Sequence, residues 1–198
     1  MIKLSKMTGK LEHIGAINTN TLSNSFCSKM HQAKKNTICN SCYSQNMLKT
    51  FRKSCVPAFE HNSQVLQDHI IHDDGLPVIN FAYFRFHGHG ELINDTHMIN
   101  FVNICNKNKN TNFALWTKRK DIIKRVLKSH DKPKNLILVY SNPLVDTLLN
   151  LPEGFDKVFN VVTTDSKDVN CRGKCIDCLK CYKKSTSTKR NIIIEEIK

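Results

Sequence analysis

The sequence predicts an α/β fold, either a partial (β/α) barrel or an open parallel sheet with helices, followed by a C-terminal cysteine-rich metal loop. Four mostly apolar segments each end in polar residues and are separated by helical patterns, which is the βα repeat of a parallel sheet. Four cysteines then fall within eleven residues near the end of the chain. We therefore expect a βα-repeat core over residues 1–165 and a basic, cysteine-rich extension over residues 166–198 that packs on this core.

The predicted strands of this core cover residues 77–86, 112–117, 135–140 and 157–162. Their apolar residues occur on both faces, as in parallel strands that are buried between layers. A further short strand is expected at residues 14–17, and residues 192–197 are expected to form an extra strand or a short helix.

The predicted helices lie between these strands. Residues 43–72 carry a rough helical stripe of apolar side chains, which Pro57 is expected to kink or split. Asn94 or Asp95 can cap a helix whose last inward residue is Cys105, residues 106–112 form a loop, and residues 121–128 form a short helix. Residues 145–151 are expected to form one or two helical turns.

Length and composition favour one intracellular domain. The 198 residues are enough for a substantial core. The basic start lacks an apolar signal segment, and no apolar run approaches the about 20 residues of a membrane helix. We therefore expect a cytoplasmic location and no membrane partner. In a reducing compartment, the nine cysteines indicate metal or redox chemistry before disulfides.

The charge leaves two interpretations open. The formal net charge is +13, from 30 Lys and Arg against 17 Asp and Glu, although metal-bound thiolates would lower it. Residues 167–190 contain eight basic and two acidic residues. A basic surface suits an anionic partner such as nucleic acid. A composition rich in Lys, Asn and Ile also produces a solvated basic surface that binds nothing.

The segment of four cysteines predicts a metal centre. Its members are Cys171, Cys175, Cys178 and Cys181. Cysteines this close rarely reach the relaxed geometry of a disulfide. A turn-rich loop containing Gly173 can aim all four sulfurs at one centre, as Zn²⁺ or an iron–sulfur cluster requires. Reduced surface thiols are the alternative.

A second set of cysteines lies near the N-terminus and comprises Cys27, Cys39 and Cys42. Both sulfurs of a Cys-x-x-Cys pair can face one ion, and three ligands leave one metal position open, as a catalytic site needs. His31 or Cys55 would close the site as a fourth ligand. A thioredoxin-like redox pair is the alternative, but the residues before the motif are polar where that motif needs a strand.

The end of the strand at residues 77–86 predicts a ligand site. His87, Gly88, His89, Gly90 and Glu91 follow the strand directly. Ligands bind at the carboxyl ends of strands in barrels and open α/β sheets. The glycines let backbone approach a ligand closely, and the glutamate can receive a cationic group or a metal. The alternative is that both histidines are turn residues bonded to backbone.

Other polar residues are expected at the same edge. Arg85 lies within the end of this strand, while Lys118, Asn142 and Asp165 follow the next three predicted strands. Because the carboxyl ends of parallel strands share one edge, these side chains should line one pocket.

These motifs occur in the same order as in a known family. Cys39-x-x-Cys42-Tyr43, residues 84–91, residues 113–118 and the four-cysteine segment resemble the uncharacterised phage and bacterial family called gene product eighty-eight. The resemblance covers roughly residues 24–182. Family members usually carry an acidic residue after the glycine of the His-Gly stretch, whereas Glu91 sits a little later. The resemblance implies an architecture more than an activity, and a location in the cytoplasm of a bacterium or a phage-infected cell.

That architecture looks like the partial barrel of radical S-adenosylmethionine (SAM) enzymes. Those enzymes hold a [4Fe-4S] cluster with three cysteines and leave the fourth iron for SAM. The resemblance implies such a cluster at Cys27, Cys39 and Cys42. The eleven residues between Cys27 and Cys39 exceed the usual three, and the aromatic Tyr43 follows the last cysteine instead of preceding it.

The resemblance also suggests roles for two other stretches. Gly88, Gly90 and Glu91 are similar in kind to the Gly-Gly-Glu stretch that receives the SAM amino group. Cys171, Cys175 and Cys178 have the usual cluster spacing, but the fourth cysteine of that segment makes it look like a closed auxiliary cluster. A reassignment in which this segment holds the SAM-binding cluster stays open.

Two main function classes follow. The first is a radical-SAM-like iron–sulfur enzyme of unknown substrate, with one or two [4Fe-4S] clusters and SAM as cosubstrate. Its catalytic candidates are Arg85, His87, His89, Glu91 and Lys118, and its cofactor-binding candidates are Tyr43, Gly88, Gly90, Glu91, Asn142 and Asp165. The second is a zinc-stapled nucleic-acid-binding protein without catalysis. An iron–sulfur electron carrier or redox sensor is a further alternative, because cysteine spacing suits iron and zinc alike.

Overall fold

The computed structural model describes residues 1–33, 36–164 and 168–197. Its centre is a seven-stranded sheet whose spatial order follows the chain order from β1 to β7. The strands are β1 (Ser5–Lys6), β2 (Gly15–Ile17), β3 (Tyr83–Phe86), β4 (Asn112–Thr117), β5 (Leu136–Val145), β6 (Lys157–Val162) and β7 (Ile192–Glu196). Strand β1 is antiparallel to β2, and all later neighbours are parallel.

Helices connect most of these strands. They are α1 (Ser25–Gln32), α2 (Tyr43–Lys49), α3 (Val56–Asp68), α4 (Asp95–Lys107), α5 (Lys120–Val126), α6 (Cys175–Cys178) and α7 (Thr188–Asn191). Three short 3₁₀ helices are η1 (Gly9–Leu11), η2 (Lys53–Cys55) and η3 (Asp73–Gly75). The prediction of an α/β fold with a mostly parallel sheet is confirmed. The alternative of a barrel is not confirmed, because no strand pairing joins β1 to β7 among the described residues.

The sheet has two different faces because successive side chains on a strand point to opposite sides. Phe84, Phe86 and Phe113 belong to the large core that includes buried residues of α3, α4 and α5. Ala114 and Trp116 point to the other face and pack against the segment around α6. The helices therefore cover one face, and the C-terminal cysteine-rich segment covers part of the other.

Two predicted helix signals are confirmed by their local geometry. The side chain of Asn94 caps α4, where its Oδ1 accepts a hydrogen bond from the backbone N–H of His97 at 2.9 Å. The predicted helix over residues 43–72 is split into α2 and α3, and Pro57 stands in the first turn of α3. Proline fits there because first-turn N–H groups lack a partner within the helix.

Two sequence predictions are corrected by asparagine side chains from distant elements. The strand predicted at residues 77–86 is shorter, because Asn108 accepts from the backbone N–H of Ile79 and donates to the carbonyl of Pro77. The helical turns predicted at residues 145–151 are wrong. Strand β5 continues to Val145, and beyond it the side-chain amide of Asn160 satisfies both backbone groups of Leu149.

The end of the chain forms a strand, one of the two structures expected there. Strand β7 pairs with β6 in parallel, with Ile192 opposite Val158 and Glu196 opposite Val162. Within the described part of the chain, no helix is long and apolar enough to cross a membrane.

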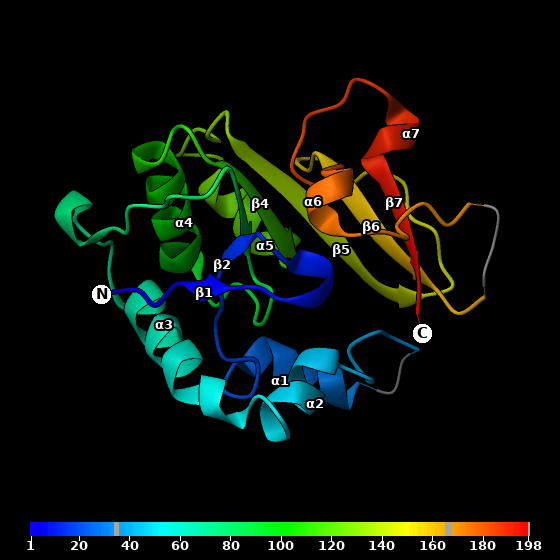
Figure 1. Ribbon diagram of the computed structural model, residues 1–198, viewed down its shortest axis with the longest axis horizontal. Coiled ribbons are helices and arrows are strands. Elements are labelled where there is room, and N and C mark those ends of the chain that lie inside the picture. Colours follow the sequence, from blue (N-terminus) through cyan, green and yellow to red (C-terminus); the bar gives the residue numbers. More distant parts are fainter. Residues whose placement is uncertain (34–35, 165–167, 198) are drawn as a thin grey trace.

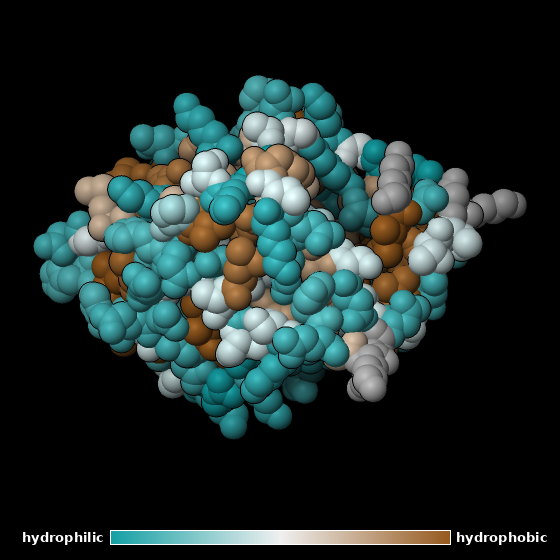
Figure 2. Space-filling model, turned by 90° about the horizontal axis from the view of Figure 1, so that it is seen from below, coloured by the Kyte–Doolittle hydropathy of each residue, from teal (hydrophilic) through white to brown (hydrophobic). Residues whose placement is uncertain are grey.

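Helices α1 and α2 lie at the carboxyl end of the sheet (Figure 1). The connection between them is fastened to β5, since Thr37 forms a β-bridge with Leu144 and the N–H of Ile38 donates to the carbonyl of Pro143 at 2.9 Å. Figure 2 shows the molecule from this side, where small hydrophobic areas are separated by hydrophilic side chains. The first cysteine-bearing loop is therefore held over the edge where the parallel strands end.

Candidate functional site

A cavity of about 1270 Å³ lies between the strand ends and the C-terminal segment. Both cysteine sets contribute to its lining, which includes Cys27, Cys39, Cys42, Cys171, Cys175 and Cys181. Two groups of thiols that are more than a hundred residues apart in the chain therefore face one space. Cys178 lines a smaller pocket with the other three cysteines of its segment.

The N-terminal set is positioned by two helix starts. Cys27 lies in the first turn of α1, where the side chain of Asn24 accepts from its backbone N–H, and Cys42 directly precedes α2. Burial raises the pKa of the Cys27 thiol, and so do the nearby Glu91 and Cys42, while Lys118 opposes the rise. The three predicted cysteines therefore line the same cavity, close to the ends of β3 and β4.

The two candidates for a fourth ligand differ. His31 lies beside the trio, with its Nδ1 in hydrogen-bond contact with the carbonyl of Cys39 at 2.9 Å. Cys55 does not belong to the described lining of the cavity and is partly buried elsewhere, at the start of α3. Only His31 is placed near the predicted site.

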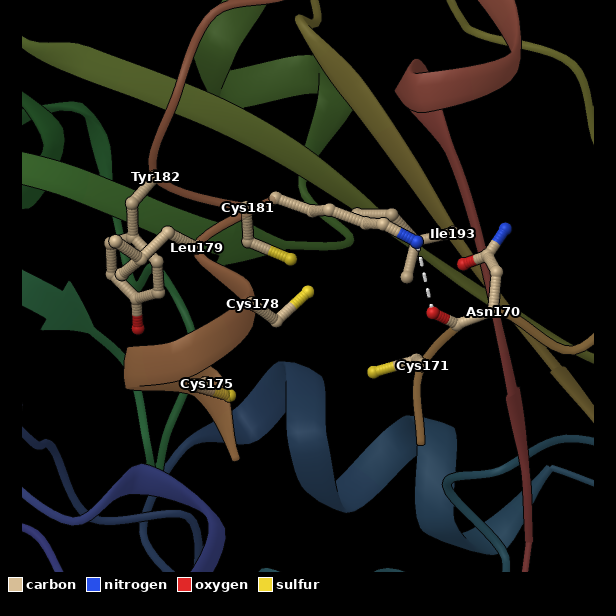
Figure 3. Close-up of a pocket in the computed structure, with 9 residues that line it drawn as sticks. Asn170, Cys171, Cys175, Cys178, Leu179, Cys181, Tyr182 and Ile193 are labelled. Carbon is tan, nitrogen blue, oxygen red and sulfur yellow. Dashed lines mark hydrogen bonds between the residues drawn. The ribbon is translucent and has the colours of Figure 1, made fainter. Parts of the chain in front are cut away.

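The C-terminal set is positioned by a single helical turn. Figure 3 shows Cys171, Cys175, Cys178 and Cys181 around one pocket, with their sulfurs directed into the space between them. Helix α6 ends at Cys178, and the next residue, Leu179, has a φ of 51° that turns the chain back so that Cys181 returns to the pocket. The backbone N–H of Cys171 donates to the carbonyl of Ile194, which ties the start of the segment to β7.

Cysteine sulfur is the ligand type that both Zn²⁺ and iron–sulfur clusters take. Within residues 1–33, 36–164 and 168–197, no three His, Cys, Asp or Glu side chains stand close enough together to hold a metal ion. Burial nevertheless raises the pKa of Cys171, Cys175 and Cys181. Thiolates in such surroundings need a positive partner, and Zn²⁺ or an iron–sulfur cluster provides one.

A family profile described as Gene product 88 matches residues 3–191. The chain belongs to the Gene product 88 family. No curated protein and no solved structure matches it. The family assignment agrees with the motif order in the sequence, and the chemistry has to be argued from the residues.

Glu91 links two strand ends in this Gene product 88 protein. Its carboxylate accepts hydrogen bonds from Thr117 Oγ1 at 2.5 Å, from the N–H of Leu92 at 2.8 Å and from the N–H of Lys118 at 2.8 Å. Burial raises the pKa of Glu91, while the charge of Lys118 opposes that rise. The expected contact with a cationic group therefore competes with three donors of the chain itself.

The two histidines after β3 have different surroundings. His89 is bonded through Nδ1 to Ser44 Oγ at 2.8 Å, and burial lowers its pKa to about 4. His87 lines the cavity, and burial lowers its pKa to about 3. Neither ring nitrogen of His87 has a hydrogen-bond partner among the described residues. Burial thus favours the neutral imidazole of His87 at the cavity wall, while the backbone of Trp116 opposes the shift of its pKa. The ring of His89 is bonded to a side chain and not to backbone.

The glycines of this stretch make room for the chain itself. A Cβ on Gly88 would lie 2.8 Å from Asn18 Oδ1, and a Cβ on Gly90 would lie 2.0 Å from Thr19 Oγ1. Gly90 also has a φ of 96°. The close approach that we expected for a ligand is made by the loop after β2. Tyr43 lines the cavity and donates its hydroxyl to the carbonyl of Gly88.

The remaining candidates at the strand ends differ in their positions relative to the cavity. Lys118 lines the cavity and donates from Nζ to Ser141 Oγ at 2.9 Å. Asn142 is fully buried inside the bulge of β5, where its amide donates to Asn160 Oδ1 and the carbonyl of Thr147, so we assign it a structural role. Asp165 lies outside the described residues.

Sequence reasoning missed the aromatic partners of Arg85. The guanidinium carbon of Arg85 lies 3.9 Å from the ring centroid of Trp116, and Tyr182 packs against Trp116 with ring centroids 5.8 Å apart. The available signal was Arg85 itself, a charged residue inside an otherwise apolar and aromatic strand. Such a residue indicates either an edge position or a specific partner.

Proposed function

We propose that this Gene product 88 protein is a radical-SAM-like iron–sulfur enzyme. Cys27, Cys39 and Cys42 would hold a [4Fe-4S] cluster with one open position for SAM. Cys171, Cys175, Cys178 and Cys181 would hold a closed auxiliary cluster. The observation that carries the proposal is that both thiol sets border one cavity at the carboxyl ends of sequentially ordered parallel strands.

The place of the N-terminal set within the fold supports the open-site assignment. Its loop follows β2, the first strand of the parallel series, and crosses to the end of β5 at Thr37. Ligand sites in singly ordered βα folds gather at this edge. Three thiols from one loop leave a coordination position that a cosubstrate can occupy.

When bound, a cluster with an open iron site supplies the one-electron chemistry that protein side chains lack. The chain would supply charged and hydrogen-bonding side chains around this cluster. Lys118 provides a positive charge close to Cys27 and Cys39, where it counters the thiolate charge. Glu91 holds the backbone of Lys118 in place, and the neutral ring of His87 offers a hydrogen-bonding group without adding charge.

Anaerobic purification with metal analysis tests the proposal. We expect brown protein with about eight iron atoms per chain, four for each cluster. After reduction with dithionite, we expect SAM to be consumed and methionine released. Colourless protein with stoichiometric zinc would reject the proposal and would favour a zinc-stapled nucleic-acid-binding protein. Iron without SAM consumption would favour an electron carrier or a redox sensor.

A further inference from the structure

Arg85 is held in an unusual position within the sheet. Its guanidinium carbon lies over the ring of Trp116, 3.9 Å from the centroid, and its Nε donates to the carbonyl of His87 at 3.1 Å. Within the described part of the chain, the guanidinium makes no other hydrogen bond and no ion pair. Stacking and a single hydrogen bond fix the orientation of the group and leave its remaining N–H donors available.

No carboxylate is paired with Arg85 in the described part of the chain. The sheet positions that share its face are apolar or aromatic and include Tyr83, Ala114, Trp116, Val139 and Phe159. Four glutamates line the cavity. Glu12 pairs with Lys174, Glu195 pairs with Lys10, and Glu91 accepts from the ends of β3 and β4, while Glu196 stands at the end of β7. A partly buried cation is costly unless an anion compensates it.

Arg85 and Lys118 both line the cavity. Arg85 donates from Nε to the carbonyl of His87, and its guanidinium lies over Trp116, which packs beside the C-terminal segment. Lys118 donates from Nζ to Ser141 Oγ. Arg85 is therefore placed between the loop after β3 and the C-terminal segment.

We propose that Arg85, held over the ring of Trp116, binds a carboxylate or phosphate group of the substrate in the cavity between the two cysteine sets. A guanidinium offers two parallel N–H donors that match either group. The cavity, at about 1270 Å³, is large enough for a ligand that carries such a group. That the bound anion is the substrate rests on the function proposed above, whereas the anion site itself does not.

Equilibrium dialysis of the anaerobically purified chain tests the site, with radiolabelled inorganic phosphate and acetate as separate probes. We expect saturable binding of at least one anion, with one site per chain. Phosphate binding identifies a phosphorylated substrate, and acetate binding identifies a carboxylate. Arg85→Gln should weaken anion binding at least about tenfold, since it removes the positive charge and the two parallel N–H donors of the guanidinium. Arg190→Gln removes an exposed arginine from α7 and should leave binding unchanged.

Arg85→Lys separates anion binding from a purely structural role in holding the C-terminal metal. Lysine keeps the charge but loses the planar fork and much of the stacking. We expect Arg85→Lys to retain wild-type metal content and to bind the anion several-fold more weakly. Wild-type anion affinity in this variant, or the absence of saturable binding in the wild type, would overturn the proposal. Zinc in place of iron would reject the enzyme function and leave the anion site standing.

Discussion

The two cysteine sets border the same cavity but are held in different ways. The N-terminal set is carried by helix starts and loops among polar strand ends, near Lys118 and Glu91. The C-terminal set is carried by one short helix that packs on the apolar face of the sheet, with Tyr182 buried beside Trp116. The difference indicates a division of labour, in which one set faces a polar space suited to a reactant and the other is anchored in core.

This division makes the C-terminal segment part of the folded core. Tyr182 is among the largest fully buried side chains, and β7 extends the sheet beyond β6. Loss of the N-terminal centre should therefore affect chemistry first, and loss of the C-terminal segment should affect stability first. The following predictions test this contrast between the two regions.

The largest expected effect is on metal and activity. Cys39→Ser should lower iron from about eight to about four atoms per chain and abolish SAM consumption, because a two-cysteine site cannot hold the open cluster. Cys178→Ser should lower iron by the same amount but leave some SAM consumption. Cys105→Ala is the matched control, because Cys105 is fully buried in the main core, away from both sets. Equal iron loss in this control would contradict the assignment of ligands.

The next largest effect is on stability. Tyr182 is 2% exposed and packs against Tyr83 and Trp116, so Tyr182→Ala should lower the free energy of unfolding by about 3–5 kcal/mol. Tyr43 is 51% exposed, and Tyr43→Ala should cost about 1 kcal/mol or less. Urea unfolding of both variants measures the difference.

A second variant at position 182 separates packing from hydrogen bonding. The hydroxyl of Tyr182 has no hydrogen-bond partner among the described residues. Tyr182→Phe should therefore be close to neutral, because it removes a buried polar group that lacks a partner. A loss as large as that of Tyr182→Ala would show that the hydroxyl, and not the ring, anchors the C-terminal segment.

Glycines in the two regions should respond differently to alanine. Gly90 has a φ of 96°, and an added Cβ would lie 2.0 Å from Thr19 Oγ1 and 2.7 Å from the Thr19 carbonyl oxygen. Gly90→Ala should therefore cost at least about 2 kcal/mol. Gly173 has no atom within 4 Å of the added Cβ, so Gly173→Ala should change stability by less than about 0.5 kcal/mol. Equal unfolding midpoints in urea would disprove this contrast.

The elements that could be predicted are those determined by local pattern. Strands β4 and β6 occupy the residues expected of them, because each is an apolar run bounded by polar residues. The errors arise where one distant side chain replaces a backbone partner. Asn108 bonds the backbone of residues 77–79 and keeps them out of the sheet, and Asn160 holds Leu149 in an irregular turn. A hydrogen bond between backbone and the side chain of an asparagine from a distant element leaves no local pattern in the sequence.

The same limit applies to the candidate site. The cysteine sets could be found because their spacing is local. The stack of Arg85 on Trp116 joins different strands and was not foreseen. A polar residue at a strand end is equally consistent with binding a ligand and with bonding the chain. Lys118 lines the cavity, whereas the side-chain amide of Asn142 donates its hydrogen bonds to other groups of the chain inside the β5 bulge. Only the fold distinguishes the two residues.

The smallest expected difference concerns pH and belongs to the region of the N-terminal set. Burial lowers the pKa of His87 from 6.5 to about 3, so between these two pH values the ring is protonated in the unfolded chain and neutral in the folded chain. The contribution of His87 to the free energy of unfolding is fully present above pH 6.5 and is lost as the pH falls toward 3. Between pH 7 and pH 5.5, the wild type should lose about 1 kcal/mol more than His87→Gln, measured by urea unfolding at each pH. If His87→Gln kept the wild-type pH dependence, the ring would have to be charged or solvated in the folded protein, and the cavity wall near the N-terminal set would be wetter than its burial indicates.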